Sequence, residues 1–330
     1  MFAIYINELL ITMRVYLTLP LPLDETQNMS EPQFLPINTK HVRQQFDRRA
    51  PLDAQQFLYG EIALRMLSRL DYIRYRPTRI LDAGCGAGHA IDTLQAQYPE
   101  MQYTGLDHSP ILLEVARQRH TTQPSLWQRL RKQPALPLQF VQADLAKSLL
   151  PPESQDFVWS NLALHWHPQP EAVFTEWRRL LVPEGLLMFS VFGPATLREL
   201  REAMAQAELP FTGMQFVDMH DYGDQLLQSG FEDPVMDQET ITLTYQTAEK
   251  LLSEVHLLGG NPVIGRYPAL PSRAQYQRLL NALNAQRHMD GTLHLSIEVA
   301  YGHAWRAKTH RHASGEVSIP ISSITRRRKK

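Results

Sequence analysis

The stretch that decides the fold is Thr78-Arg-Ile-Leu-Asp-Ala-Gly-Cys-Gly-Ala-Gly88. It predicts a short apolar strand over 79–82, followed by glycines at alternate positions: Gly84, Gly86 and Gly88. Glycine lets a backbone turn tightly and approach a ligand closely, because it has no side chain. Apolar residues at helical spacing follow, at Ile91, Leu94 and Tyr98. A strand, a glycine turn and a helix N-terminus together predict a nucleotide-binding site.

The spacing of the glycines narrows the kind of nucleotide. The dinucleotide fingerprint G-x-G-x-x-G would need glycine at position 89, which is His89, and no P-loop motif is present. The pattern that stands here, D-x-G-x-G-x-G from Asp82, resembles the first motif of class I methyltransferases that use S-adenosylmethionine. That cofactor has no phosphate, and its ammonium group suits Asp82 as a direct or water-mediated partner. Taken alone, the glycines are also explained by a tight strand-to-helix turn.

The next two predicted strands also end in acids. The second, 101–107, ends at Asp107, which lies 19 residues after Gly88 and is placed to accept both ribose hydroxyls of an adenosine. The alternative role is a helix cap, because a helix is predicted from 111 to 119; we favour the ribose. The third strand, 138–144, ends at Asp144. In the methyltransferase pattern this acid lies near the adenine, whereas the alternative is an ordinary loop aspartate.

Strands and helices alternate through the middle of the chain. A fourth strand is predicted at 156–161, a helix at 170–182, a turn at 183–185 and a fully apolar fifth strand at 186–192. This alternation predicts a doubly wound α/β fold with a parallel sheet. Ligands of such sheets bind beyond the carboxyl ends of the strands, which is where Asn161 lies.

Helices are predicted on both sides of this region. The helical stretch 42–70, broken near Pro51, has an apolar face of Leu52, Phe57, Ile62, Leu64, Met66, Leu67 and Leu70. Later helices are predicted at 195–207, 220–229, 247–258 and 272–286, and later strands at 235–245 and 293–305. Residues 121–138 read as a basic surface insertion. We divide the chain into an N-terminal arm (1–40), a main domain (41–306) with a helical insertion at about 246–290, and a basic tail (307–330).

Composition favours a soluble globular enzyme. The 330 residues are 43% hydrophobic and 20% charged. The single cysteine, Cys85, excludes intramolecular disulfides and suggests a reducing compartment, so we expect a cytoplasmic location. The N-terminus does not have the pattern of a signal peptide, and no apolar run reaches the roughly 20 residues that span a bilayer. Residues 301–330 carry eight Lys or Arg and one Glu, so the first 300 residues sum to −8.

A narrower resemblance covers more of the chain. The segments that carry it are Trp159-Ser-Asn-Leu-Ala-Leu-His-Trp166, Pro183-Glu-Gly185, Thr196-Leu-Arg-Glu-Leu200, Leu258-Gly-Gly-Asn261 and Glu298-Val-Ala-Tyr-Gly-His303. Together they resemble the malonyl-acyl-carrier-protein O-methyltransferases of biotin synthesis. The resemblance implies a mostly parallel, seven-stranded, Rossmann-like sheet with an antiparallel closing pair. It also implies S-adenosylmethionine as cofactor and methyl transfer to the free carboxylate of malonyl-acyl-carrier protein.

One segment departs from that family. Phe46-Asp-Arg-Arg-Ala50 is followed by Pro51, and the tyrosine expected soon afterwards is absent. The N-terminal helices also resemble a related family of respiratory complex I assembly factors, reported to hydroxylate an arginine. Two alternatives therefore stay open: a factor that binds the cofactor without transferring methyl, and a methyltransferase for another small molecule.

The acceptor side of the site is predicted from chemistry. A malonyl carboxylate is already ionised, so it needs no general base, and its attack is favoured by removal of water and moderate contact with a cation. Arg198 and Arg201 are our candidates for that cation, and His165 for lining the acceptor pocket. The alternatives are a solvated charge cluster and a core histidine. We expect no metal, because helix capping explains Asp218 and Asp221 beside His220.

The predicted partner is an acidic acyl-carrier protein. Its binding face would be the basic insertion with Arg129, Arg131 and Lys132, or the C-terminal basic run. No aromatic-interleaved basic motif accompanies these charges, so we predict neither a nucleic-acid partner nor a membrane partner.

Overall fold

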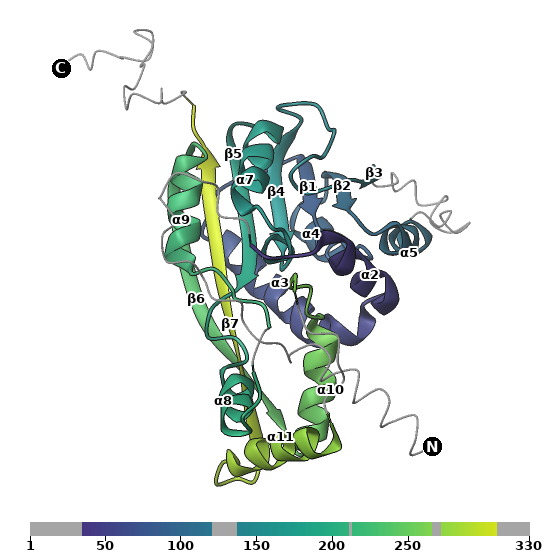
Figure 1. The fold of residues 1–330 in the computed structure, drawn as a ribbon. Helices are drawn as coiled ribbons and strands as arrows, with labels where there is room; N and C mark the ends of the chain where they lie inside the picture. The colour runs from purple at the N-terminus through teal and green to yellow at the C-terminus, as the bar shows by residue number, and fades with distance from the viewer. Residues whose placement is uncertain (1–34, 121–136, 211–212, 266–271, 309–330) are drawn as a thin grey trace, which may run out of the picture.

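The computed structural model describes residues 35–120, 137–210, 213–265 and 272–308. The described residues form a seven-stranded sheet in the order β3-β2-β1-β4-β5-β7-β6 (Figure 1). The strands are β1 (Arg79–Ala83), β2 (Gln102–Asp107), β3 (Leu138–Gln142), β4 (Gln155–Asn161), β5 (Leu181–Phe192), β6 (Phe231–Tyr245) and β7 (Leu293–Arg306). Strands β1 to β5 pair in parallel, and β7 is antiparallel to both β5 and β6. The predicted fold class is confirmed, including the closing pair.

The helices lie on both faces of the sheet. They are α2 (Thr39–Arg49), α3 (Gln56–Leu70), α4 (Ile91–Gln97), α5 (Pro110–His120), α7 (Pro170–Leu180), α8 (Arg198–Gln206), α9 (Met219–Gln228), α10 (Ala248–Leu258) and α11 (Arg273–Ala285), with 3-10 turns η1 (Asp53–Gln55) and η2 (Leu164–Trp166). Successive strand residues point to opposite faces. Phe157 and Trp159 pack with α3 and α4, whereas Val158 packs with α7. Such two-sided burial explains the consecutive apolar residues in the middle of the central strands.

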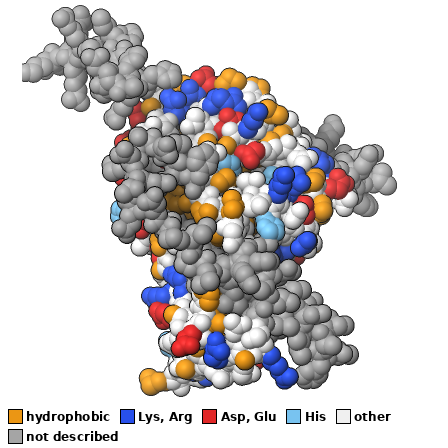
Figure 2. Space-filling model, viewed as in Figure 1, with side chains coloured by type: hydrophobic (Ala, Val, Ile, Leu, Met, Phe, Trp, Pro, Cys, Tyr) orange, Lys and Arg blue, Asp and Glu red, His pale blue; other side chains and the backbone are white. Residues whose placement is uncertain are grey.

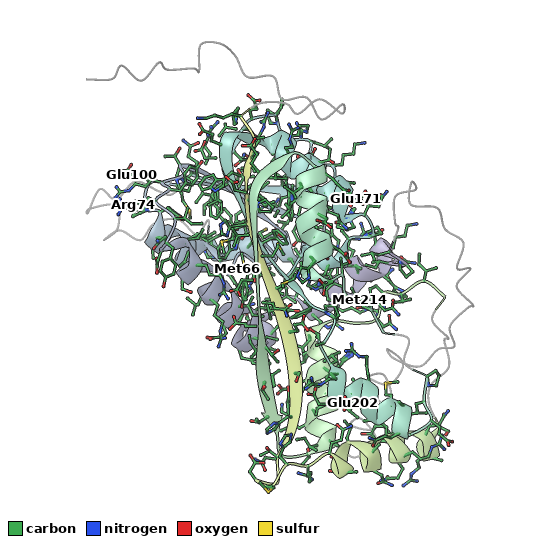
Figure 3. The ribbon with its side chains drawn as sticks, turned by 90° about the vertical axis from the view of Figure 1, so that its left-hand side faces the viewer. Met66, Arg74, Glu100, Glu171, Glu202 and Met214 are labelled. Atoms are coloured by element: carbon green, nitrogen blue, oxygen red, sulfur yellow. The ribbon has the colours of Figure 1, made fainter. Side chains whose placement is uncertain are left out.

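Strands β6 and β7 extend beyond the rest of the sheet, and α8, α10 and α11 gather at their far end (Figure 1). Figure 3 shows the same arrangement from the side, with Glu202 of α8 in this group and Glu171 of α7 at the opposite end of the molecule. Hydrogen bonds tie α11 to the region of α8: Arg278 Nε donates to the Ala207 carbonyl at 3.0 Å, and Gln286 Nε2 donates to the Glu199 carbonyl at 3.2 Å.

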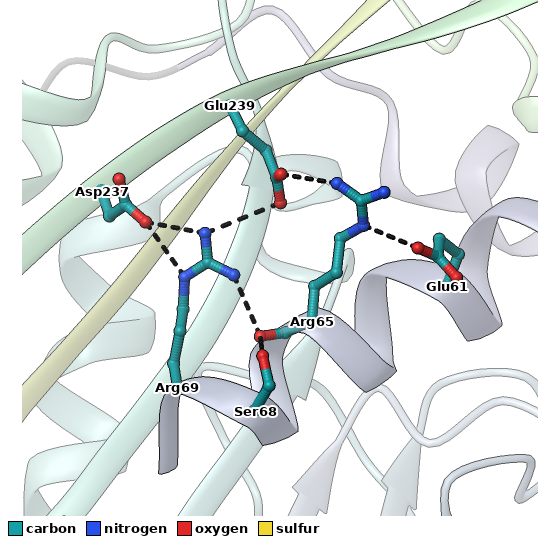
Figure 4. Close-up of polar contacts among 6 residues, drawn as sticks. All are labelled: Glu61, Arg65, Ser68, Arg69, Asp237 and Glu239. Atoms are coloured by element: carbon teal, nitrogen blue, oxygen red, sulfur yellow. Dashed lines mark hydrogen bonds and ion pairs between the residues drawn. The ribbon is translucent and has the colours of Figure 1, made fainter. Parts of the chain in front are cut away.

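An ion-pair network fixes α3 to the edge strand β6 (Figure 4). Arg65 contacts Glu239 at 2.5 Å, and Arg69 contacts Asp237 at 2.7 Å. The Arg69 guanidinium also lies 3.7 Å from the centre of the Tyr301 ring on β7. The network therefore joins a helix near the N-terminus to the last two strands of the sheet.

Two predictions about this fold are wrong. Residues 183–185 do not separate a helix from a strand, because they lie in an irregular part of β5, between the pairs Gln155–Leu181 and Phe157–Leu186. On α3, Phe57 and Leu64 are 48% and 54% exposed, whereas Leu58, Ile62, Met66 and Leu70 are buried. The buried stripe repeats every four residues, and Phe57 and Leu64, seven apart, share a different face.

Several predicted segments lie outside the described residues. They are most of the 1–40 arm, most of the 121–138 insertion with Arg129, Arg131 and Lys132, and most of the 307–330 tail. Within the described ranges, none of the helices combines the length and apolar character needed to cross a membrane.

Candidate active site

A cavity of about 290 Å³ lies at the carboxyl ends of β1, β2 and β4. This is the sheet position where ligands of doubly wound folds bind, and the volume is close to the roughly 300 Å³ lower end of small-molecule sites. Of the residues predicted to bind the cofactor, the structure brings six to its wall: Asp82, Gly84, Gly86, Asp107, Asp144 and Asn161. The seventh, Gly88, does not line it.

The glycine turn needs glycine for two different reasons. Gly84 has φ +87°, and a side chain there would overlap Ala163, which follows β4. Gly88 has φ +77°, and an added Cβ would come within 3.0 Å of Ile91 Cδ1. Gly84 therefore allows the turn to pack closely on the segment after β4, and Gly88 allows it to pack on α4.

Asp107 joins the glycine turn to the start of α5. Its Oδ2 accepts a hydrogen bond from Gly86 N at 2.9 Å, and its Oδ1 accepts one from Ser109 N at 2.8 Å. Burial raises the pKa of Asp107, although His108 and these two N–H groups act in the opposite direction. Each carboxylate oxygen can accept a further hydrogen bond. The local turn and a ligand contact are therefore compatible in one side chain.

Asp82 lies at the end of β1 and is 2% exposed. Tyr103 Oη donates to its Oδ2 at 2.7 Å. Burial raises the pKa of Asp82 to about 7, and the charge of Asp107 acts in the same direction. A cation bound in the cavity would favour the ionised form of this carboxyl.

Asp144 follows β3 and is held by His167, a cavity residue that we did not predict. His167 Nε2 lies 3.1 Å from Asp144 Oδ1, and Gln169 N donates to His167 Nδ1 at 3.0 Å. Nδ1 also lies 3.1 Å from the Gln169 carbonyl oxygen, so Gln169 holds one side of the ring while the other side faces Asp144. The hydrogen bond from His167 lowers the pKa of Asp144. The only sequence signal for His167 was its place just after β4.

Asn161 fastens the end of β4 to its neighbours. Its Nδ2 donates to the Tyr59 carbonyl of α3 at 3.0 Å, and its Oδ1 accepts from Ser190 Oγ of β5 at 2.8 Å. Both ends of the amide are therefore used inside the protein. Asn161 shapes the cavity wall, with Tyr59 and Gly60 of α3 beside it.

The structure does not bring His165, Arg198 or Arg201 to this cavity. Arg198 is exposed and pairs with Glu199 at 3.2 Å, and Arg201 donates to the Thr196 and Pro194 carbonyls at 2.8 and 2.7 Å. These contacts all stay within α8 and the loop that precedes it.

His165 is 2% exposed and lies among aromatic rings. Its ring centre is 4.8 Å from that of Phe192, 5.1 Å from Trp166 and 5.6 Å from Phe216. Neither ring nitrogen has a hydrogen-bond partner among the described residues, and burial lowers the pKa of His165 to about 3. The imidazole is therefore neutral at physiological pH.

A second, smaller cavity of about 40 Å³ lies beside these rings. Trp166 borders both cavities. The second is lined by Trp166, Phe192, Thr196, Leu197, Met214, Phe216, Val255, Leu258, Gly259, Gly260 and Asn261. This wall has no charged side chain, and it brings together segments from β5, the loop before α8 and the end of α10.

The first cavity is also lined by α2, which the sequence did not implicate. Lys40, Arg43 and Phe46 of α2 reach its wall, and the Phe46 ring lies 5.4 Å from Trp166. Over the described ranges no three His, Cys, Asp or Glu side chains group as metal ligands. Asp218 instead caps α9, accepting from His220 N at 2.8 Å.

This chain resembles known proteins in sequence. A family profile described as "Methyltransferase domain" matches residues 81–189. A malonyl-[acyl-carrier protein] O-methyltransferase of Laribacter hongkongensis is 43% identical over 267 residues, which is 80% of this chain and 88% of the relative. Its counterpart in Gallionella capsiferriformans is 40% identical over 87% of this chain and 97% of the relative.

A solved structure shares the fold. A Haemonchus contortus phosphoethanolamine N-methyltransferase 2 in complex with S-adenosyl-L-methionine has a TM-score of 0.50 and 17% identity, covering 81% of this chain and 60% of that one. At this identity the likeness concerns the fold alone.

Proposed function

Because this chain belongs to the family of malonyl-[acyl-carrier protein] O-methyltransferases, we propose that it transfers a methyl group from S-adenosylmethionine to the free carboxylate of malonyl-acyl-carrier protein. The product is a methyl ester, and the pathway is biotin synthesis. The observation that carries the proposal is the meeting of the glycine turn and three strand-end acids at one cavity, in a chain that is 43% identical to such an enzyme over most of both lengths.

The residues present fit S-adenosylmethionine. Gly84 and Gly86 of the turn line the cavity without side chains, so a ligand can approach the backbone closely. The buried acids Asp82 and Asp107 need a cation or hydrogen-bond donors, and this cofactor has both an ammonium group and ribose hydroxyls. When bound, the cofactor supplies an electrophilic methyl group on a sulfonium.

Each acid has a separate role in this proposal. Asp82 binds the ammonium group, directly or through water, and its ionised form is favoured by that charge. Asp107 accepts from the ribose hydroxyls with the lone pairs that Gly86 and Ser109 leave open. Asp144 lies on the adenine side, where His167 holds its carboxylate in place. Gly86 lies against Asp107, and Asn161 of β4 forms the wall on the other side of Asp82.

The acceptor side depends on removal of water rather than on a base. A carboxylate is ionised at neutral pH, and its nucleophilicity rises when its hydration is removed. The second cavity supports this role, because its wall is uncharged and Trp166 borders both cavities. A strong ion pair to the attacking oxygen would slow the reaction, so a wall without cations is favourable.

His165, Arg198 and Arg201 act on the acceptor indirectly in this proposal. The neutral His165 supports Trp166 and Phe192, which line the second cavity. Arg201 holds the carbonyls of Pro194 and Thr196, and so fixes the loop that carries Thr196 and Leu197 to the same wall. Arg198 extends the charged surface of α8.

Methyl transfer from labelled cofactor tests the proposal. We expect label to enter malonyl-acyl-carrier protein as an alkali-labile ester. Acetyl-acyl-carrier protein is the matched control, because it has the same thioester and no free carboxylate. The gene should also restore growth of a biotin-requiring strain that lacks this enzyme.

The two alternatives predict other outcomes. Cofactor binding without transfer to any malonyl thioester would favour an assembly or hydroxylation factor. Transfer to a small acceptor such as a quinone, with none to the malonyl thioester, would favour another substrate class.

A further inference from the structure

Two cations of α2 lie at the wall of the first cavity. Lys40 and Arg43 both line it, and both are exposed. They are three residues apart, so they are neighbours on one side of the helix. Neither has an ion pair or hydrogen bond in the part of the chain that the structure describes. Figure 2 shows Lys and Arg side chains on the surface over this region.

A third cation, Arg119, is paired: it contacts Asp53 at 2.7 Å and lies beside His89 of the cavity wall. The cavity wall itself is acidic, with Asp82, Asp107 and Asp144. Asp82 and Asp107 are buried inside the cavity, whereas Lys40, Arg43 and Asp144 are exposed at its rim, which therefore carries a net positive charge from these three residues. This separation favours a cationic ligand within the cavity and an anionic one outside it.

Size and charge together define the anionic partner. This step rests on the proposed function: the acceptor is a malonyl group carried by a protein, and a protein cannot enter a cavity of about 290 Å³. The carrier must stay at the rim while its thioester arm enters. An acyl-carrier protein is acidic, and the first 300 residues of this chain sum to −8, so the two bodies repel one another. Docking therefore needs a local positive surface beside the cavity.

We infer that Lys40 and Arg43 form the docking point for the acidic surface of the acyl-carrier protein. Both cations project from one rigid helix, whose Asn38 cap accepts from His41 N at 3.1 Å. The backbone before α2 is also fixed, because Asn38 N donates to the Pro262 carbonyl at 2.8 Å. The carrier would thus be held on an element that also contributes Phe46 to the wall near Trp166.

Charge reversal on α2 tests this inference. We compare Arg43→Glu and Lys40→Glu/Arg43→Glu with Arg48→Glu. This control makes the same charge change as Arg43→Glu on the same helix, at about 140° from Arg43 and about 80° from Lys40 at 100° per residue. Arg48 is exposed, does not line the cavity and has no partner among the described residues. Each variant is assayed with malonyl-acyl-carrier protein, malonyl-coenzyme A and malonyl-pantetheine, and its cofactor affinity is measured.

With the carrier protein, we expect the double variant to raise KM roughly tenfold while kcat changes less than twofold, since rim charges act mainly on association. Salt should raise KM for the unmodified chain and have less effect on the variant. The rise in KM should be clearly smaller for malonyl-pantetheine and malonyl-coenzyme A than for the carrier protein, cofactor binding should not weaken, and Arg48→Glu should match the unmodified chain throughout.

Three results would overturn the inference. An equal rise in KM with malonyl-coenzyme A would show that the two cations bind a phosphate of the thioester arm. An equally large rise in KM with malonyl-pantetheine, or weaker cofactor binding, would show that Lys40 and Arg43 contact a ligand inside the cavity. An unchanged KM with the carrier protein would remove them from docking altogether. Failure of the unmodified chain to methylate any of the three acceptors would instead contradict the proposed function.

Discussion

At the residue scale, the strand-end acids differ in what surrounds them. Asp107 accepts two backbone N–H groups, Asp82 accepts one phenol hydroxyl, and Asp144 accepts from His167 and from Ala146 N. Burial raises the pKa values of Asp82 and Asp107, whereas the hydrogen bond from His167 lowers that of Asp144. Three aspartates at equivalent strand ends therefore differ in their hydrogen-bond donors and in the direction of their pKa shifts.

The first prediction concerns Asp107→Ala. Loss of the ribose acceptor should weaken cofactor binding by about 1.5–3 kcal/mol, as for a hydrogen bond to a charged group. The melting temperature should fall as well, because Gly86 N and Ser109 N lose their acceptor. Calorimetric titration with the cofactor and thermal unfolding measure the two effects. Glu100→Ala, at an exposed acid, is the control, and unchanged affinity in Asp107→Ala would reduce Asp107 to a helix cap.

The second prediction concerns pH. The pKa of Asp82 is about 7 in the folded protein, above its ordinary 3.8, so the carboxyl takes up a proton as pH falls through 7. A protonated Asp82 no longer attracts the ammonium group, and cofactor affinity should therefore decrease from about pH 7.5 to about pH 5.5.

The same shift has the opposite consequence for the free protein. Between its ordinary pKa and about 7, the folded chain keeps a proton on Asp82 that the unfolded chain has lost, so this group lowers stability as pH rises. In Asp82→Asn both pH dependences should flatten, as measured by titration calorimetry and by denaturant unfolding at several pH values. A full pH dependence of affinity in that variant would assign it to another group.

At the scale of elements, α3 contacts both the cavity wall and the edge strand of the sheet. Its carbonyl at Tyr59 holds Asn161 at the cavity, and its Arg65 and Arg69 hold β6 (Figure 4). The buried stripe of α3 faces the sheet between these contacts. The helix therefore sets the distance between the edge strand and the cavity wall.

The third prediction is that Arg69→Ala lowers the free energy of unfolding by about 1–2 kcal/mol. The ion pair with Asp237 contributes up to about 1 kcal/mol at this exposure, and the contact with the Tyr301 ring adds about 0.5–1 kcal/mol. Chemical denaturation measures the loss. A double-mutant cycle with Asp237→Ala should recover the ion-pair part. Arg74→Ala, at an exposed arginine without a described partner, should change stability little.

At the scale of the whole molecule, three distant segments meet at Trp166. Phe46 of α2 lies against its ring, Phe192 of β5 lines the adjoining cavity, and a side chain at Gly259 would overlap its indole. The Leu258-Gly-Gly-Asn261 segment thus connects the α8–α10–α11 group to the wall that both cavities share. No single segment contains this part of the site.

The fourth prediction is that Gly259→Ala reduces kcat/KM for malonyl-acyl-carrier protein by roughly tenfold to a hundredfold, because displacement of Trp166 misplaces the acceptor. Cofactor affinity should fall by a smaller factor, since the acids at the strand ends are untouched. Steady-state kinetics and cofactor titration separate the two. Gly223→Ala on α9 is the control, because a Cβ there makes only an ordinary contact with Met236. Equal losses in both variants would contradict a specific role for Trp166.

The sheet, the glycine turn and the order of the strand-end acids can all be predicted from the amino-acid sequence alone. These features depend on short-range properties: strand periodicity, the conformational freedom of glycine, and the parallel arrangement that places successive strand ends at one edge. The meeting of Asp82, Asp107, Asp144 and Asn161 at one edge of the sheet could therefore be predicted from strand order alone.

The surroundings of these four cavity residues depend on how distant segments of the chain pack in the folded molecule. Segments far apart in the chain contribute the rim cations of α2, His167 and the wall around Trp166. Arg198 and Arg201 make local contacts instead and do not line the cavity. The exposure of Phe57 and Leu64 has the same origin. Helical spacing shows which residues share a face, but which face is buried depends on the partner that packs against it, and long-range packing settles that partner.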